Sequence, residues 1–164
     1  MPDSSSDIPV DAKAYRDRAL ALLKNQKTMV LAVNMGSAPW AAPVYYVYVG
    51  AGIYFFSSPR SFHIQALEEC AQCAGSIYAD SNRWQDISGL QMTGTVQEIR
   101  AKVDKLRITS RYLTKFPFAR RLLSAEIGKS QSVAQKVCLY AFRPLQVHCL
   151  DNHMGFGRRV LVAL

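Results

Sequence analysis

The residues best suited to chemistry lie in one short segment, FFSSPRSFH, which ends at His63. A strand pattern ends and a helix pattern begins there, with Ser57, Ser58 and Ser61 gathered at the junction. Free backbone N–H groups at a helix N-terminus form a natural phosphate site, and serine hydroxyls can add hydrogen bonds. Arg60 or His63 can supply positive charge. The segment predicts an anion site, although capping the helix and shaping the turn would also explain the serines.

The four cysteines form no recognisable metal or redox motif. Cys70 and Cys73 make an isolated Cys-x-x-Cys at the end of a helix pattern, whereas a thioredoxin-like motif opens a helix after a strand. Cys138 and Cys149 lie on predicted strands with a spacing that matches zinc sites poorly. No secretory feature favours a disulfide framework. We interpret all four as structural thiols.

Two histidines, His148 and His153, flank Asp151 and invite a metal interpretation. No cluster of cysteines or carboxylates accompanies them, so solvent-facing or hydrogen-bonded imidazoles are the better interpretation, and no metal is predicted. The sequence contains no Gly-x-Ser-x-Gly, no phosphate-binding loop of the Walker type and no Gly-x-Gly-x-x-Gly.

The formal net charge is +8, and much of the excess lies between Arg100 and Arg121, where eight basic residues accompany the single acid Asp104. Such a run can attract nucleic acid or a membrane surface, or it can serve an anionic ligand. Charge runs are common on amphipathic helices, so a solvated helix face is the interpretation we favour. Binding to nucleic acid or membrane is not expected.

The size and composition favour a single domain over residues 1–164, large enough to bury a core. No apolar run reaches the roughly 18 residues needed to cross a bilayer. Residues 1–7 are polar and acidic without a signal-peptide pattern, and we expect them to form a flexible tail. A cytoplasmic location is the expectation that follows.

Apolar spacings of three and four predict a first helix over Pro9–Asn25, with Asp7 as its candidate cap. A short helix is expected from Ser61 to about Cys70, and a longer one over Ala101–Phe116 that Pro117 ends. Phe118–Ser124 is expected to form a further short helix, followed by a loop over Ala125–Lys136. The expected buried stripes are Ala12, Tyr15, Ala19, Leu22 and Leu23 in the first helix, and Val103, Leu106, Leu113 and Phe116 in the longer one.

Runs rich in aromatic and β-branched residues predict six or seven short strands. Pro43 interrupts one of these strands and indicates an edge, a bulge or a close approach of ligand to backbone. Gly94 indicates a bulge in another. Tight turns between the strands favour an antiparallel barrel, which removes exposed edges by closure. The predicted strands are Thr28–Asn34, Trp40–Val49, Ile53–Ser57, Cys73–Ala79, Leu90–Ile99, Val137–Leu150 and Arg158–Leu164.

Several segments, in order, resemble the pyridoxamine 5′-phosphate oxidase-like flavoproteins. They are Ala-Pro-Val-Tyr-Tyr-Val from Ala42, Tyr-Phe-Phe-Ser-Ser from Tyr54, and Ser-Phe-His-x-x-x-Leu from Ser61. Trp84-x-x-Ile-x-Gly-Leu-Gln-x-x-Gly is similar to a strand of the same family. The segments Lys-Phe-Pro-Phe-Ala-Arg from Lys115 and Asp-Asn-His-Met-Gly-Phe-Gly from Asp151 resemble a small bacterial subgroup.

The resemblance implies a mainly β, α+β fold: a six-stranded antiparallel split barrel with an N-terminal helix and a helical insertion. It further implies a homodimer that holds FMN in two interface clefts. The family's phosphate-binding residues match Ser57, Ser58, Ser61 and His63. The backbone beside the flavin ring matches Pro43, Val44 and Tyr45, and the strand that often faces the cofactor across the dimer carries Trp84 and Gln91.

This chain has Ser61-Phe62-His63 where many relatives have Ser-Arg-Lys. An apolar ring replaces the guanidinium, and a titratable imidazole replaces the lysine. Three outcomes are open: Arg60 compensates, FMN binds weakly, or another ligand takes the cleft. Two interpretations are open for the tail Gly155–Arg159. Either Phe156 lies against the flavin ring, with Arg158 or Arg159 near the phosphate, or the segment is an ordinary turn.

The resulting hypothesis is an FMN-dependent oxidoreductase in which the flavin transfers hydride or electrons. It is not expected to be a true pyridoxamine-phosphate oxidase, because the arginine-rich C-terminal signature of those enzymes is missing. A deazaflavin is an alternative cofactor. A second hypothesis is a haem-binding or haem-handling protein that uses His63, His148 or His153. A third is a flavin-binding sensor or nucleic-acid-associated module that uses the basic run.

Overall fold

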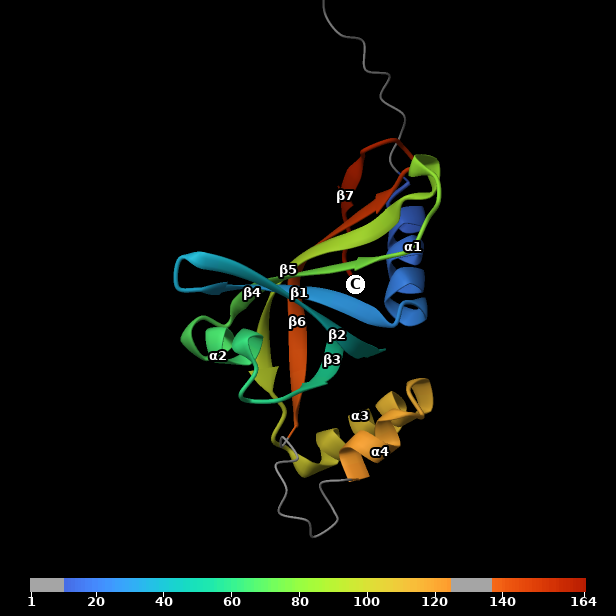
Figure 1. Ribbon diagram of the computed structural model, residues 1–164. Helices are drawn as coiled ribbons and strands as arrows, with labels where there is room; N and C mark the ends of the chain where they lie inside the picture. The colour runs from blue at the N-terminus through green and yellow to red at the C-terminus, as the bar shows by residue number, and fades with distance from the viewer. Residues whose placement is uncertain (1–10, 125–136) are drawn as a thin grey trace, which may run out of the picture.

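The computed structural model describes residues 11–124 and 137–164, and the predicted tail and the predicted loop over 125–136 lie outside them. The chain forms a curved antiparallel sheet with helices on its outside (Figure 1). The elements are α1 (Ala12–Asn25), β1 (Thr28–Met35), β2 (Ala38–Val49), β3 (Gly52–Ser57), α2 (Phe62–Glu69), β4 (Gln72–Tyr78), the 3-10 turn η1 (Trp84–Asp86), β5 (Ser88–Glu98), α3 (Lys102–Lys115), α4 (Ala119–Ser124), β6 (Cys138–Asp151) and β7 (Arg159–Leu161).

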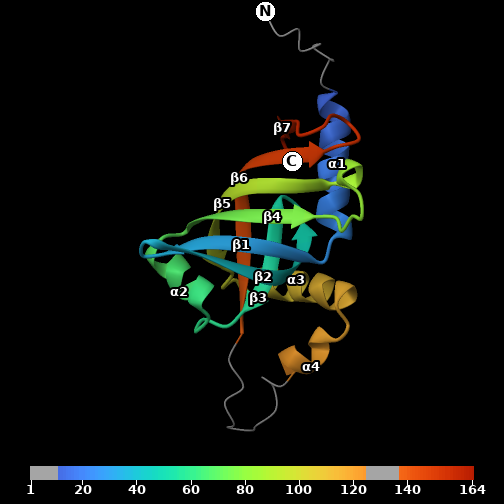
Figure 2. The same cartoon turned by 45° about the horizontal axis from the view of Figure 1, so that its top comes forward.

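The sheet confirms the predicted fold class. Its strands follow the order β3-β2-β1-β4-β5-β6-β7, every neighbouring pair is antiparallel, and β3 also pairs with β6. This last pairing joins the two ends of a six-strand order, so the sheet curls into a barrel-like ring. β7 is an extra strand on the far part of β6, beside α1 (Figure 2). Closure of this kind leaves few exposed strand edges.

Helix α1 covers one end of the barrel. It begins at Ala12, because the Asp11 carboxylate accepts a hydrogen bond from the Ala14 N–H at 3.0 Å and caps the helix. The predicted start at Pro9 was therefore too early. Ala12 is exposed, whereas the rest of the predicted stripe is buried: Tyr15, Ala19, Leu22 and Leu23.

Helix α3 packs against the outer side of β2 with a face that matches the predicted stripe at Leu113 and Phe116 but not at Val103 and Leu106. Ile108, Tyr112 and Phe116 are buried there, in a cluster shared with β2, β3 and β6. Val103 and Leu106 were predicted to face the core, yet they are 80% and 76% exposed. Spacings of four place Ile108, Tyr112 and Phe116 on one stripe. Burying these larger side chains removes more apolar surface from water than burying Val103 and Leu106 would.

Pro43 lies on an edge, as one of its three interpretations requires. Residues 38–45 of β2 pair with β1, and β3 joins β2 only from Tyr46 onward. Within the described residues, no strand pairs with the other side of β2 at Pro43. A residue without an N–H donor costs no ladder hydrogen bond at such a position.

Gly94 forms the predicted bulge, since the β5–β6 register shifts between Thr93 and Gly94. A Cβ atom there would lie 2.5 Å from the Arg143 carbonyl oxygen and 2.7 Å from the Phe142 ring. We expect Gly94→Ala to lower the free energy of unfolding by about 2 kcal/mol, because backbone must move to relieve the overlap. Urea denaturation measures this loss.

The matched control is Gly36→Ala. No atom lies within 4 Å of a Cβ at Gly36, whose φ is +58°, so only backbone strain of about 1 kcal/mol is expected. A smaller loss for Gly94→Ala than for Gly36→Ala would contradict the packing argument.

Candidate functional site

Ser57, Ser61 and His63 form one hydrogen-bonded cluster at the junction of β3 and α2. The Ser57 hydroxyl lies 2.7 Å from Nε2 of His63 and 3.1 Å from the Ser61 hydroxyl. Ser61 Oγ lies 3.3 Å from the same imidazole nitrogen. All three side chains are partly buried. The structure thus brings together three residues that the sequence analysis assigned to an anion site, and we call them the serine–histidine cluster.

The N-terminus of α2 lacks a side-chain cap. Ser61 occupies the N-cap position, but its hydroxyl donates to the Ser58 carbonyl oxygen at 2.7 Å and makes no capping bond. The Ser58 hydroxyl accepts from the Arg60 N–H at 3.2 Å. Among the described residues, no acceptor pairs with the backbone N–H groups of Phe62 and His63. A simple capping role therefore does not explain Ser61, and two N–H donors are available to an anion.

Among the described residues of this junction, Arg60 alone carries positive charge at neutral pH. Burial lowers the pKa of His63 below 6.5, because desolvation penalises the charged imidazolium, so the ring is neutral. Arg60 is exposed, and its guanidinium has no partner within the described part of the chain. Phe62 is also exposed and packs against Trp40, with 5.4 Å between the ring centroids.

The lowered pKa of His63 predicts a pH dependence of stability. Below about pH 6.5 the unfolded chain binds a proton more readily than the folded chain, so stability falls as the pH drops through this window. We expect urea denaturation to show that the free energy of unfolding falls less between about pH 7 and about pH 5.5 in His63→Gln than in the wild type. An identical loss in both proteins would contradict this prediction.

A second group of predicted residues lies on the outward face of the sheet. Pro43, Val30, Ser76, Gln91 and His148 are register partners in turn, and they form one row across β2, β1, β4, β5 and β6. Facing partners in a sheet project on the same side. Pro43 and Gln91 are both exposed, three interstrand spacings or about 14 Å apart.

Val44 and Tyr45 divide between the two faces of β2. The Val44 side chain is buried in the core, so only its backbone can meet a ligand. Tyr45 is 47% exposed and packs at its edge against Phe116 and Phe118.

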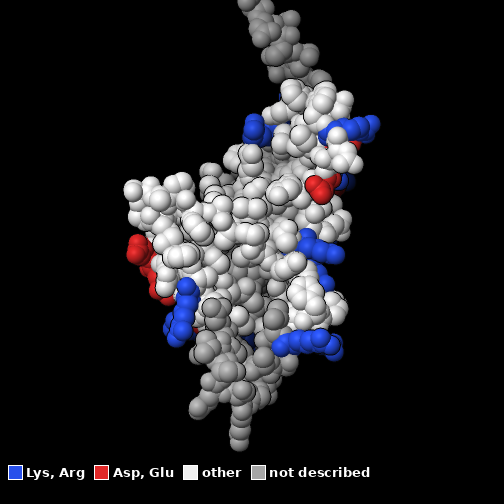
Figure 3. Space-filling view, viewed as in Figure 1, with Lys and Arg blue, Asp and Glu red and all other residues white. Residues whose placement is uncertain are grey.

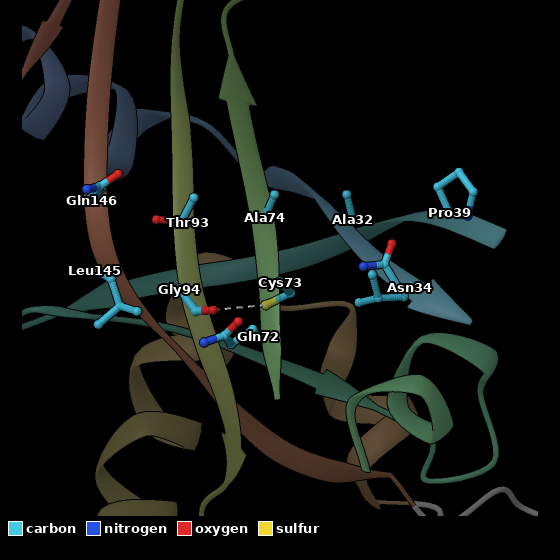
Figure 4. A pocket seen from close by; sticks show the side chains of 11 residues that line it. Ala32, Asn34, Pro39, Gln72, Cys73, Ala74, Thr93, Gly94, Leu145 and Gln146 are labelled. Carbon is cyan, nitrogen blue, oxygen red and sulfur yellow. Dashed lines mark hydrogen bonds between the residues drawn. The ribbon is translucent and has the colours of Figure 1, made fainter. Parts of the chain in front are cut away.

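An open pocket of about 560 Å³ occupies the same outward face (Figure 4). Its floor is the next row of register partners, Ala32, Ala74 and Thr93, whose small side chains create a depression in the surface of the sheet. Three carboxamides also line it, from Asn34, Gln72 and Gln146, together with Leu145 and Pro39 at its sides. No charged side chain lines the pocket. Neutral donors and acceptors of this kind suit a polar, uncharged ring.

The sequence analysis missed these pocket residues. Each is ordinary in a strand, and only the pairing of five strands brings them together. The one available signal was the alternation of small or polar residues with apolar ones along Ala32–Asn34, Gln72–Ala74 and Gln91–Thr93, which marks outward positions.

Trp84 belongs to η1 and Phe156 to the loop between β6 and β7, and these two segments lie beside the start of α1, at the end of the molecule away from α3 and α4 (Figure 1). The two ring centroids are 4.9 Å apart in an edge-to-face contact, and both rings are more than half exposed. Asn152 holds the two segments together, since its amide donates to the Trp84 carbonyl oxygen at 2.6 Å and its carbonyl accepts from the Gly157 N–H at 3.1 Å. We call Trp84 and Phe156 the aromatic pair.

Arg158 and Arg159 follow the aromatic pair in different surroundings. Arg158 is half-buried near Tyr15, whose pKa burial raises. The Arg159 guanidinium donates to the Gln91 carboxamide oxygen at 3.0 Å, so it reaches the outward face of the sheet.

The serine–histidine cluster and the aromatic pair are far apart within one chain. Ser57 pairs with Cys138 at the start of β6, and Ser88, two residues after η1, pairs with Asp151 at its end. Thirteen residue steps separate these two pairs, which is about 40 Å measured along β6, a strand that bends between its two ends (Figure 2). One chain therefore does not bring both groups to one small ligand.

The cysteines and the other histidines show no catalytic arrangement within residues 11–124 and 137–164. The four thiols are free, and burial raises the pKa of Cys73 to about 12, which keeps it protonated. His153 contacts the Asp86 carboxylate at 2.8 Å. No group of three potential metal ligands occurs there, and no helix there is long and apolar enough to cross a membrane.

The chain is similar in sequence to known proteins. A family model described as pyridoxamine 5′-phosphate oxidase matches residues 15–144. A UPF0306 protein of Photorhabdus laumondii subsp. laumondii is 24% identical over 84% of this chain and 88% of its own length.

Two solved structures share the fold at low sequence identity. A FAD-binding protein from Mesorhizobium loti superposes with a TM-score of 0.61, at 14% identity, over 79% of this chain and 88% of that chain. The haem storage protein HutZ from Vibrio cholerae superposes with a TM-score of 0.60, at 18% identity, over 82% of this chain and 89% of that chain.

Proposed function

This chain belongs to the pyridoxamine 5′-phosphate oxidase family, and from that premise we propose that it is an FMN-binding flavoprotein, an oxidoreductase whose cofactor lies between two copies of the chain. The observation that carries the proposal is the junction of β3 and α2. There, two backbone N–H groups without acceptors in the described residues adjoin the hydroxyls of Ser57 and Ser61. Such a donor set suits a phosphate group.

The residues present fit both parts of FMN. The phosphate would be held by the free N–H groups of α2, by Ser57 and Ser61, and by Arg60 from the surface. The flavin ring is planar, uncharged and edged with donors and acceptors, which suits the outward sheet face beside Pro43 and Gln91. Arg60 replaces the expected cations only in part, so we expect weaker binding of FMN than two fixed charges would give.

The separation of the predicted residues supports a dimeric site. The serine–histidine cluster and the aromatic pair lie at opposite ends of β6, and a two-fold axis between two chains can place unlike ends together. The outward face of the sheet also carries exposed apolar side chains that a partner would cover, among them Tyr45 and Leu145.

Bound FMN would supply transfer of hydride or electrons. The protein's own contribution is to bind and orient the ring and phosphate. His63 is neutral at pH 7, and in its Nε2–H tautomer it can donate a hydrogen bond to the Ser57 hydroxyl oxygen. The Ser57 hydroxyl can then donate toward a phosphate oxygen while Ser61 donates to the Ser58 carbonyl oxygen. No side chain is assigned as an acid or base.

The test is whether the purified protein carries FMN. We expect the purified protein to be yellow, or the colourless protein to take up added FMN with quenching of flavin fluorescence. Stoichiometry should be one FMN per chain, and sedimentation should give a dimer. A protein that is colourless and takes up no FMN at any concentration would contradict the proposal.

Haem is the second candidate, and His148 favours it. His63 and His153 are hydrogen-bonded to Ser57 and Asp86, whereas the His148 imidazole has no hydrogen-bond partner in the described part of the chain. His148 shares the outward row with Gln91. A Soret band on haem titration that disappears in His148→Ala, but persists in His63→Ala, would favour haem over FMN.

A further inference from the structure

The outward surface of α3 combines exposed aliphatic side chains with positive charge. Val103 and Leu106 are 80% and 76% exposed, and a spacing of three places them side by side on the helix. Lys102 lies one turn before Leu106, and Arg107 lies one turn after Val103. The two aliphatic residues are therefore flanked by cations on both sides.

The charge on this surface is largely uncompensated. Asp104 is the single acid in α3, and it pairs with Arg107 at 3.3 Å. Lys102, Lys105 and Arg111 have no ion pair within the described residues. Figure 3 shows basic side chains at the end of the molecule where α3 and α4 lie, whereas acidic side chains gather on the side of α2. The surface is thus cationic around an apolar centre.

A solvated face is the expected explanation of the basic run, because charge runs are common on amphipathic helices, and Val103 and Leu106 are expected to face the core. Their exposure changes that interpretation, since a solvated face gains nothing from aliphatic side chains at its centre. The opposite face of α3 is already used: Ile108, Tyr112 and Phe116 hold the helix against the barrel.

We propose that α3 docks on an anionic phospholipid surface, with Val103 and Leu106 inserted between headgroups and Lys102 and Arg111 on lipid phosphates. Basic helices with an apolar stripe bind membranes by this combination of burial and charge. Nucleic acid fits less well. Proteins that bind single strands stack the bases on exposed aromatic rings, and the aromatic side chain of α3, Tyr112, is buried. The aliphatic side chains of Val103 and Leu106 would gain no binding energy from contact with nucleic-acid phosphates.

Co-sedimentation with vesicles tests the proposal. The full chain is mixed with vesicles of phosphatidylcholine alone, or with equal parts of phosphatidylcholine and phosphatidylglycerol. We expect binding to the anionic vesicles only, weakened by added salt. Lys102→Gln with Arg111→Gln should lower the partition coefficient about tenfold or more. Val103→Ser with Leu106→Ser should lower it about tenfold at constant charge.

The matched control is Lys13→Gln with Lys24→Gln, which removes two exposed charges from α1 instead of α3. It should leave binding nearly unchanged, and circular dichroism should show all variants folded. Three results would overturn the proposal: absence of binding to anionic vesicles, equal losses in the α1 and α3 variants, or binding to duplex or single-stranded DNA instead of vesicles.

Discussion

FMN affinity is expected to fall several hundredfold in Ser61→Asp, while the thermal stability of the protein is retained. Ser61 occupies the N-cap of α2 without making a capping bond. Aspartate is one of the best N-cap residues, and its charge suits the helix N-terminus, so the fold should tolerate the change. The same carboxylate would occupy the N–H groups offered to the phosphate and repel it, and a like charge at close range costs several kcal/mol.

Three comparisons, one with another ligand and two with other variants, distinguish repulsion of the phosphate from other causes of weaker binding. Riboflavin lacks the phosphate, so its affinity should be the same in the wild type and in Ser61→Asp. Ser61→Ala removes only the hydroxyl and should cost about tenfold in FMN affinity. Ser37→Asp adds the same charge in the exposed β1–β2 turn and should have no effect. Fluorescence titration gives all the affinities. Wild-type affinity for FMN in Ser61→Asp would place the phosphate elsewhere.

Local patterns were sufficient to predict the barrel-like sheet and to point to Ser57, Ser61 and His63, which the structure brings together. Each strand and turn has its signal within a few residues, and Gly94 marked the bulge in β5. The members of the serine–histidine cluster lie within seven positions of one another, so the turn between β3 and α2 brings them together without help from the rest of the fold.

Long-range features could not be predicted in the same way. The pocket depends on the register of five strands, and no single strand shows it. Helix α3 carries two apolar stripes, one through Val103 and Leu106 and one through Ile108 and Tyr112. Only the shape of the barrel surface decides which one is buried, because the aromatic stripe meets Phe56 and Tyr45 there.

Mixed dimers of two defective variants are expected to recover FMN binding, and this is the strongest test of a shared site. One variant is Ser61→Asp, and the other is Trp84→Ala with Phe156→Ala. Both changes in the second variant are at exposed rings, so they should leave the fold intact. Each variant alone should bind little FMN. After the two are mixed and refolded, half of the dimers contain one chain of each kind.

Each mixed dimer has one site with an intact serine–histidine cluster from one chain and an intact aromatic pair from the other, and one site with neither. About a quarter of the wild-type FMN capacity should therefore return. The matched control mixes Ser61→Asp with Ser57→Asp, which damage the same end of the chain and should recover nothing. If tagged chains exchange freely and no FMN-binding capacity returns in the first mixture, the two halves of the site do not come from different chains. Because the two groups lie at opposite ends of β6, the aromatic pair would then have no part in binding FMN.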